Sequence, residues 1–114
     1  MTSQSSTTTD RRRRAARRPD FAPVHPGEVL REDFLRPLGL SQYALAKAIG
    51  VSQMRVSAVI HGRRAISPDT ALRLARYFGT SAEFWTVMQA TFDLECARDR
   101  SGAAIAARVA PRAA

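Results

Sequence analysis

The sequence predicts an all-α fold, and three observations support that prediction. Apolar residues recur three and four positions apart from residue 26 to about residue 98, which is the period of an amphipathic helix. Serines precede the helical stretches and glycines follow several of them, as helix caps do. The alternating pattern of a β-strand does not occur. A chain of 114 residues allows one domain with a modest core. We expect a five-helix domain at 21–100, with tails at 1–20 and 101–114.

The first helix is expected to begin at Pro26, because proline fits the first helical turn without losing a hydrogen bond. Pro37 and Gly39 are expected to end it. Its buried stripe is made of Val29, Leu30, Phe34 and, at its margin, Leu38.

The next segment, SQYALAKAIGVSQMRVSAVIHG, predicts two short helices, Ser41–Ile49 and Ser52–His61, joined at Gly50. This is the pattern of a helix-turn-helix motif. No Asp or Glu occurs from residue 41 to residue 66, and the segment is basic, which indicates DNA as the partner. The residues expected to be buried are Leu45, Ala46, Ile49, Val56, Val59 and Ile60.

A fourth helix is predicted after the N-cap Ser67, with Pro68 in its first turn and Gly79 at its end. Its apolar face is made of Ala71, Leu72, Leu74, Ala75 and Phe78. A fifth helix is predicted from Ser81 to about Arg98. The Ala-rich stretch after it has little apolar surface to bury, so we expect it to be frayed or disordered.

Half of the net charge of +8 lies in residues 1–20, which hold six Arg and two Asp. This Arg-rich tail is expected to be disordered. Three roles are open for it: an inert extension, an arm that contacts DNA, or a contact for an acidic or RNA-bound partner. The single cysteine, Cys96, cannot form an internal disulfide, and neither a signal peptide nor a membrane span is recognisable. We therefore expect a cytoplasmic protein.

Enzymatic activity is not expected, because no nucleophile motif or phosphate-binding loop is present. His25 and His61 have no Cys or carboxylate partner at metal-ligand spacing, so neither a metal nor a cofactor is expected. Glu28, Glu32 and Asp33 are interpreted as a solvated acidic face.

The second helix of the motif carries the candidate base-reading residues. Gln53 can pair with adenine through its amide, Met54 can contact a thymine methyl group, and Ser57 can bond to several bases. Arg55 falls on the flank of this face, where a phosphate contact is favoured over a base contact. Each residue is also compatible with a plain solvated position.

Backbone phosphates are expected to meet two other groups of residues. Ser41 and Gln42 open the preceding helix, whose free N–H groups suit an anion. Arg63 and Arg64 follow the second helix in a loop and are otherwise a solvated pair.

On the fifth helix, Trp85, Met88 and Phe92 exceed what a small core needs. They are interpreted either as the cap of the core or as a homodimer seam. A seam would place two recognition helices about 34 Å apart, one turn of DNA.

Residues 25–94 resemble the HigA type of antitoxin among the Xre-like, lambda-repressor-like helix-turn-helix regulators. Two motifs besides the helix-turn-helix support this resemblance: HPGEVLREDFLRPLGLSQ and GRRAISPDTALRLARYFGTSAEFW. The resemblance implies a lambda-repressor-like domain that binds its own operator as a dimer. It also implies neutralisation of a HigB-like toxin, a small RelE-type ribonuclease that cleaves mRNA on the ribosome.

By motif position, the base-reading role falls on Gln53, Met54, Arg55 and Ser57, and backbone contacts fall on Ser41, Gln42 and Arg63. Two alternatives to an antitoxin are open. One is a stand-alone Xre-type repressor without a toxin, and the other is a protein–protein module that has lost DNA binding. A basic protein encoded directly upstream would favour the antitoxin.

Overall fold

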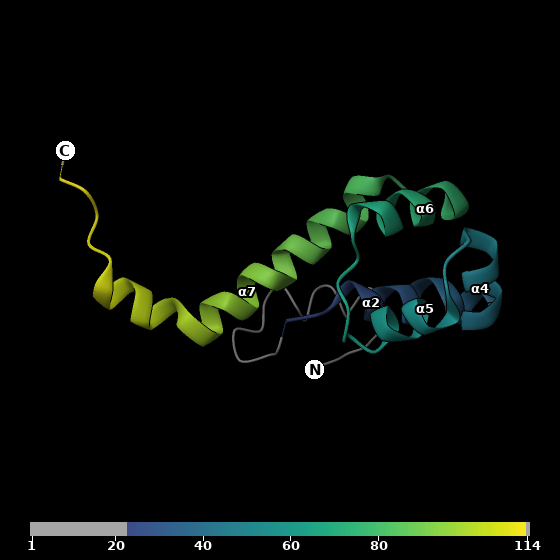
Figure 1. Cartoon of the computed structure of the whole chain (residues 1–114), viewed down its shortest axis with the longest axis horizontal. Helices are drawn as coiled ribbons and strands as arrows, with labels where there is room; N and C mark the ends of the chain where they lie inside the picture. Colours follow the sequence, from purple (N-terminus) through teal and green to yellow (C-terminus); the bar gives the residue numbers. More distant parts are fainter. Residues whose placement is uncertain (1–22, 114) are drawn as a thin grey trace, which may run out of the picture.

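The structure, a computed structural model, describes residues 23–113, and every regular element in this range is helical. The all-α class with five helices is confirmed for the described residues (Figure 1). The predicted basic tail lies outside them. The first helix consists of three consecutive pieces, α2 (Pro26–Val29), η1 (Leu30–Leu35) and α3 (Arg36–Leu38). The others are α4 (Gln42–Ile49), α5 (Gln53–Ile60), α6 (Pro68–Phe78) and α7 (Ala82–Arg108).

The first helix differs from the prediction in its middle. Its η1 segment is π-helical, and the N–H of Arg36 donates to the carbonyl of Arg31, five residues back. Pro37 lies inside the helix, so the expectation that it ends the helix is wrong; Gly39, with φ 62°, does end it. Proline has no N–H to donate, so one α-helical bond is missing in any case and the preceding turn can widen. The wider turn changes which residues face the core, and Leu38 is exposed rather than buried.

Helices α4 and α5 form the predicted helix-turn-helix. The N–H of Ala44 donates to Ser41 Oγ and the N–H of Arg55 donates to Ser52 Oγ, each at 3.0 Å, so both serines are N-caps. Gly50 ends α4 with φ 74°, a conformation that costs a glycine nothing. The predicted buried residues of both helices are confirmed as buried.

Helix α6 begins and ends as predicted, with Ser67 as N-cap and Gly79, φ 76°, as C-cap. Most of its predicted apolar face packs inward, with Ala71 and Leu74 fully buried. Leu72 is an exception and is exposed. At about 100° per residue on an ideal helix, Leu72 lies about 60° beyond Ala75 and outside the arc of the inward residues, so its side chain falls beyond the edge of the buried face.

Helix α7 is longer than the sequence predicts. It runs to Arg108 rather than ending near Arg98, so the expectation that the whole Ala-rich stretch is irregular is wrong for residues 101–108. Its C-terminal half projects from the helical bundle (Figure 1). Starting a helix is unfavourable, but the packed N-terminal half of α7 is already helical. Each residue that extends it gains one hydrogen bond, and alanine has the highest helix propensity of all residues.

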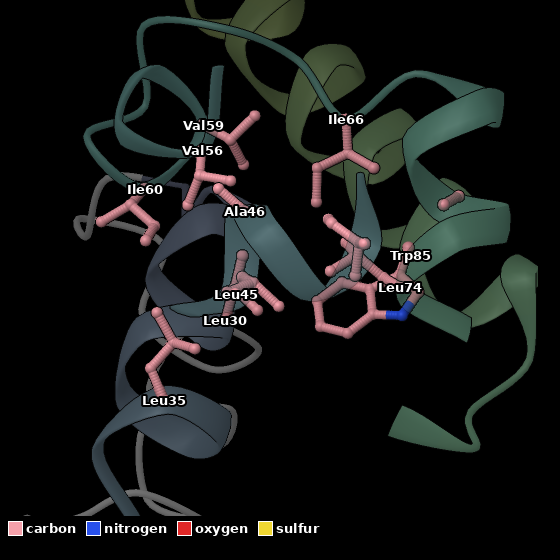
Figure 2. Packing of buried hydrophobic residues seen from close by; sticks show 12 residues of the cluster. Leu30, Leu35, Leu45, Ala46, Val56, Val59, Ile60, Ile66, Leu74 and Trp85 are labelled. Atoms are coloured by element: carbon pink, nitrogen blue, oxygen red, sulfur yellow. The ribbon is translucent and has the colours of Figure 1, made fainter. Parts of the chain in front are cut away.

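The core is one cluster to which all five helical segments contribute (Figure 2). Trp85 lies within it with no exposed surface, its ring 5.1 Å from that of Phe34. Its indole N–H donates to Thr80 Oγ1 at 2.8 Å, which satisfies its one polar atom. The interpretation of Trp85 as a dimer-seam residue is therefore wrong, because its own domain buries it completely.

Candidate DNA-binding surface

Helix α5 presents the predicted base-reading residues on its outer side. Gln53 and Met54 are exposed at its N-terminal end, and Met54 keeps 81% of its surface accessible. Ser57, one turn further on, is half-buried, and its hydroxyl lies 3.4 Å from Nδ1 of His61. The opposite side of the helix holds the buried Val56 and Val59. A helix held in this way can enter a major groove with its first residues toward the bases.

Arg55 lies beside this surface rather than within it. Its Nη1 is 3.9 Å from Oδ2 of Asp69 at the start of α6, and Asp69 also accepts from Arg73 Nε at 2.8 Å. The carboxylate is exposed and the Arg55 contact is long, so this ion pair is weak. Arg55 can therefore exchange the carboxylate for a phosphate, which agrees with its predicted position on the flank.

The N-terminus of α4 offers a second polar group on the same motif. Ser41 is exposed and Gln42 is half-buried. The Ser41 hydroxyl already accepts from Ala44, so what this end can offer a phosphate is the Gln42 side chain, backbone N–H groups and the positive end of the helix dipole.

The loop after α5 carries Arg63 and Arg64, both exposed, on a fixed backbone. Gly62 adopts φ 74°. The N–H groups of Arg63 and Arg64 both donate to the carbonyl of Ala58, at 2.8 and 3.2 Å. The loop therefore continues the hydrogen bonding of α5, and the two guanidinium groups extend from a defined position next to it.

Comparison with known proteins agrees with this geometry. The family model described as Helix-turn-helix matches residues 30–85. Virulence-associated protein I of Dichelobacter nodosus is 53% identical over 74 residues, which are 65% of this chain and 68% of that protein. The solved structure of an addiction module antidote protein of the HigA family from Coxiella burnetii is 41% identical, with a TM-score of 0.77, and the match covers 81% of this chain and all of that one. The chain belongs to the HigA family of helix-turn-helix antitoxins.

A second solved HigA structure bears on the surface itself. It is the Pseudomonas aeruginosa antitoxin HigA with the higBA promoter, 42% identical, with a TM-score of 0.78, over 80% of this chain and 99% of that one. The family model spans α4, α5 and the loop to Arg64, so every predicted DNA contact lies inside it. Met88 and Phe92 lie beyond it.

Two residues that sequence reasoning did not assign hold this HigA-family surface in place, and Arg73 is the first. Its Nη1 donates to the carbonyl of Ile49 at 2.8 Å and to that of Gly50 at 3.3 Å, which fixes α6 against the turn between α4 and α5. The spacing of Asp69 and Arg73 on one helix indicates their ion pair. No local signal indicates the bonds to a turn 23 and 24 residues away.

His25 is the second, and sequence analysis considered it only as a histidine without a metal-ligand partner. It is buried, and its Nδ1 accepts from the N–H of Gly27 at 2.9 Å, which caps α2. Its ring meets the ring of Phe92 edge to face, with centroids 4.8 Å apart. Burial lowers the pKa of His25 below 6.5, against the opposing effects of Asp93 and of a hydrogen bond with the Arg64 backbone. The ring is therefore neutral at pH 7.

Met88 and Phe92, the remaining seam residues, are half-buried. Met88 packs against the core and Phe92 against His25, so both have contacts within the domain. The large exposed side chains of α7 lie elsewhere, at Phe84, Val87, Leu94 and Ile105. Among the described residues, no group of three or more His, Cys, Asp or Glu side chains could hold a metal ion, and no helix is long and apolar enough to cross a membrane.

Proposed function

We propose that this HigA-family chain is the antitoxin of a type II toxin–antitoxin pair, and that it represses its own operon by sequence-specific DNA binding. The observation that carries the proposal is the exposed outer face of α5, flanked by cations and free of acidic residues from residue 41 to residue 66. A relative 42% identical to this chain was solved with its promoter, which supports the same use of the surface here.

In this proposal the surface divides into a reading part and a positioning part. Gln53, Met54 and Ser57 contact base edges in the major groove. The N-terminus of α4, together with Arg55 and the Arg63–Arg64 loop, contacts phosphates on either side. Base contacts determine which sequence is bound, whereas phosphate contacts determine register and overall affinity.

The binding test uses the purified full chain and short duplexes that cover the DNA upstream of its own operon, followed by fluorescence anisotropy. One duplex should bind much more tightly than a scrambled duplex of the same composition, and salt should weaken both. Equal affinity for the two duplexes at every salt concentration would contradict operator recognition.

The toxin part of the proposal rests on the family alone. The partner is a HigB/RelE-like mRNA-cleaving protein encoded next to this chain. Co-expression should restore the growth of cells that the neighbouring protein arrests, and the two proteins should co-purify. If the promoter binds but no neighbouring protein is captured or neutralised, the alternative of a stand-alone Xre-type repressor is favoured. Because operator DNA is the ligand, the proposed place of action is the cytoplasm.

A homodimer is also part of the proposal, with a seam on a different face of α7 from the predicted one. Val87, Leu94 and Ile105 keep 60%, 51% and 54% of their surface exposed. They recur at intervals of seven and eleven residues, which return to nearly the same side of a helix. Two such stripes from two copies can cover each other without disturbing either core.

A further inference from the structure

The loop that carries Arg63 and Arg64 is anchored at its far end by helix α7. The side chain of Ile66 is buried in the core. The N–H of Ile66 donates to Oε1 of Gln89 at 2.7 Å, and Nε2 of that buried glutamine donates in turn to Oδ1 of Asp93 at 3.0 Å. The loop therefore cannot move away from α7 at Ile66 without breaking this hydrogen bond between the Ile66 N–H and the buried Gln89 side chain.

At its near end the loop lies against His25. The ring of His25 is the nearest group to the position that a side chain at Gly62 would occupy, at 3.8 Å. It also forms a hydrogen bond with the backbone of Arg64. Nδ1 accepts from Gly27, so the proton of the neutral ring is on Nε2, and we infer that this N–H is the group that interacts with the Arg64 backbone.

His25 therefore joins three parts of the fold. It caps α2, and a Cβ atom at Gly27 would overlap the carbonyl of Val59, so α2 and the end of α5 meet backbone to backbone here. It rests on α7 through Phe92, close to Asp93. It holds the loop through Arg64.

We propose that His25 is a positioning residue for DNA binding: it fixes the Gly62–Arg64 backbone so that Arg63 and Arg64 meet the phosphates without first being ordered. His25 itself contacts no DNA. Two long guanidinium side chains lose conformational freedom on binding, and a mobile backbone beneath them would add enough to that loss that the two phosphate contacts would no longer form. The inference rests on the proposed phosphate contacts of this loop.

The test compares two variants in operator binding. His25→Asn keeps a short side chain able to accept from the Gly27 N–H but loses the ring and the bond to Arg64. Thr80→Val is the matched control, because it removes the acceptor of the Trp85 indole N–H and so destabilises the domain without touching the loop. Log affinity falls as log salt rises, and His25→Asn should make this negative slope shallower by about 1 to 2, since each phosphate contact contributes about 0.9. Thr80→Val should lower the melting temperature and leave the slope unchanged.

A double-mutant cycle separates positioning from general damage. In a background of Arg63→Ala with Arg64→Ala, His25→Asn should change the slope no further, because the contacts it positions are already gone. An unchanged slope in the single variant, or an additional fall in this background, would overturn the proposal.

The anchor itself is measured without DNA. Hydrogen exchange at the amides of Gly62–Arg64 should be faster in His25→Asn than in the unmodified protein or in Thr80→Val. Unchanged exchange would overturn the anchoring. If the unmodified protein binds no promoter DNA, the proposed function fails, and the exchange result still decides whether His25 holds the loop.

Discussion

Gln53 and Arg63 lie on the same surface but differ in what they can recognise. The Gln53 amide carries both a donor and an acceptor, so it can match the edge of one base and reject the others. In the proposed complex, the Arg63 guanidinium on the loop beside α5 contacts a phosphate, and phosphates are the same at every step of the duplex. Substitutions at the two positions should therefore have different signatures.

Replacing Gln53 with alanine should reduce discrimination between the operator and a scrambled duplex by about 1–3 kcal/mol, with the salt slope unchanged. Arg63→Ala is the matched control and should do the reverse, weakening both duplexes alike and lowering the slope by about 1. Anisotropy titrations at several salt concentrations measure both quantities. If neither substitution changes binding, α5 does not face the DNA in the proposed way.

His25 also gives the domain a pH dependence. Its pKa is lowered by burial in the folded chain, so below about 6.5 the unfolded chain takes up the proton first. The contribution of the neutral His25 ring to the free energy of unfolding should be fully present above pH 6.5. It should be lost as the pH drops through that value toward the lower pKa of the folded state. Protonation would also place a hydrogen on Nδ1, where the Gly27 N–H now donates. Asp93 and the Arg64 backbone, which favour the charged ring, limit the loss.

Thermal unfolding at pH 7.5 and at pH 5.5 measures this effect. The unmodified protein should lose melting temperature between the two values, and His25→Asn should lose clearly less. His61 is present in both proteins and therefore cancels in the comparison. An equal loss in both would show that His25 does not titrate in this range.

At the scale of the elements, the helix boundaries were predictable because their signals are local. Ser41, Ser52, Ser67 and Ser81 each cap the helix that follows them, and Gly39 and Gly50 end helices with positive φ. The predicted boundaries are wrong where a boundary depends on residues outside its own helical turn. The π-helical η1 compensates for Pro37 one turn later, and α7 continues because its other half is already packed.

The turn between α4 and α5 depends on one such distant neighbour, Arg73. Its bonds to the carbonyls of Ile49 and Gly50 are charge-assisted, and the side chain is partly exposed, so Arg73→Ala should cost about 1–2 kcal/mol of unfolding free energy. Arg76→Ala removes a cation from the same helix and serves as the control, with a change expected near zero. Chemical denaturation measures both. Equal losses would mean that the turn does not need this clamp.

For the whole molecule, the candidate surface was predictable as a set of exposed positions but not as an assembled site. Helical periodicity separates Val56 and Val59 from Gln53 and Met54 without any structure. The contacts that hold the surface join residues more than twenty positions apart, as in Arg73 to Ile49 or Gln89 to Ile66. The same limit explains Trp85, since an apolar position on a helix does not reveal whether its own domain or a second copy buries it.

The dimer is tested at the exposed stripe of α7. Leu94→Glu should convert a dimer to a monomer in light scattering and leave the helical content unchanged, because Leu94 is 51% exposed in the single chain. Arg100→Glu, on a different side of the same helix, is the charge control and should leave the mass unchanged. The seam is misplaced if Leu94→Glu stays dimeric, and there is no dimer if the unmodified chain is a monomer.

The 27 residues of α7 span about 40 Å at a rise of about 1.5 Å each. In a pair joined along this helix, the distance between the two reading surfaces depends on where along α7 the copies meet. The exposed residues of the stripe lie seven and eleven residues apart, so moving the junction from one of them to the next shifts it by about 10 or 16 Å, close to three or five base pairs. Operator spacing in such a dimer would therefore change in steps: substitutions on α7 would select among a few discrete spacings, while the residues that read the bases stayed the same.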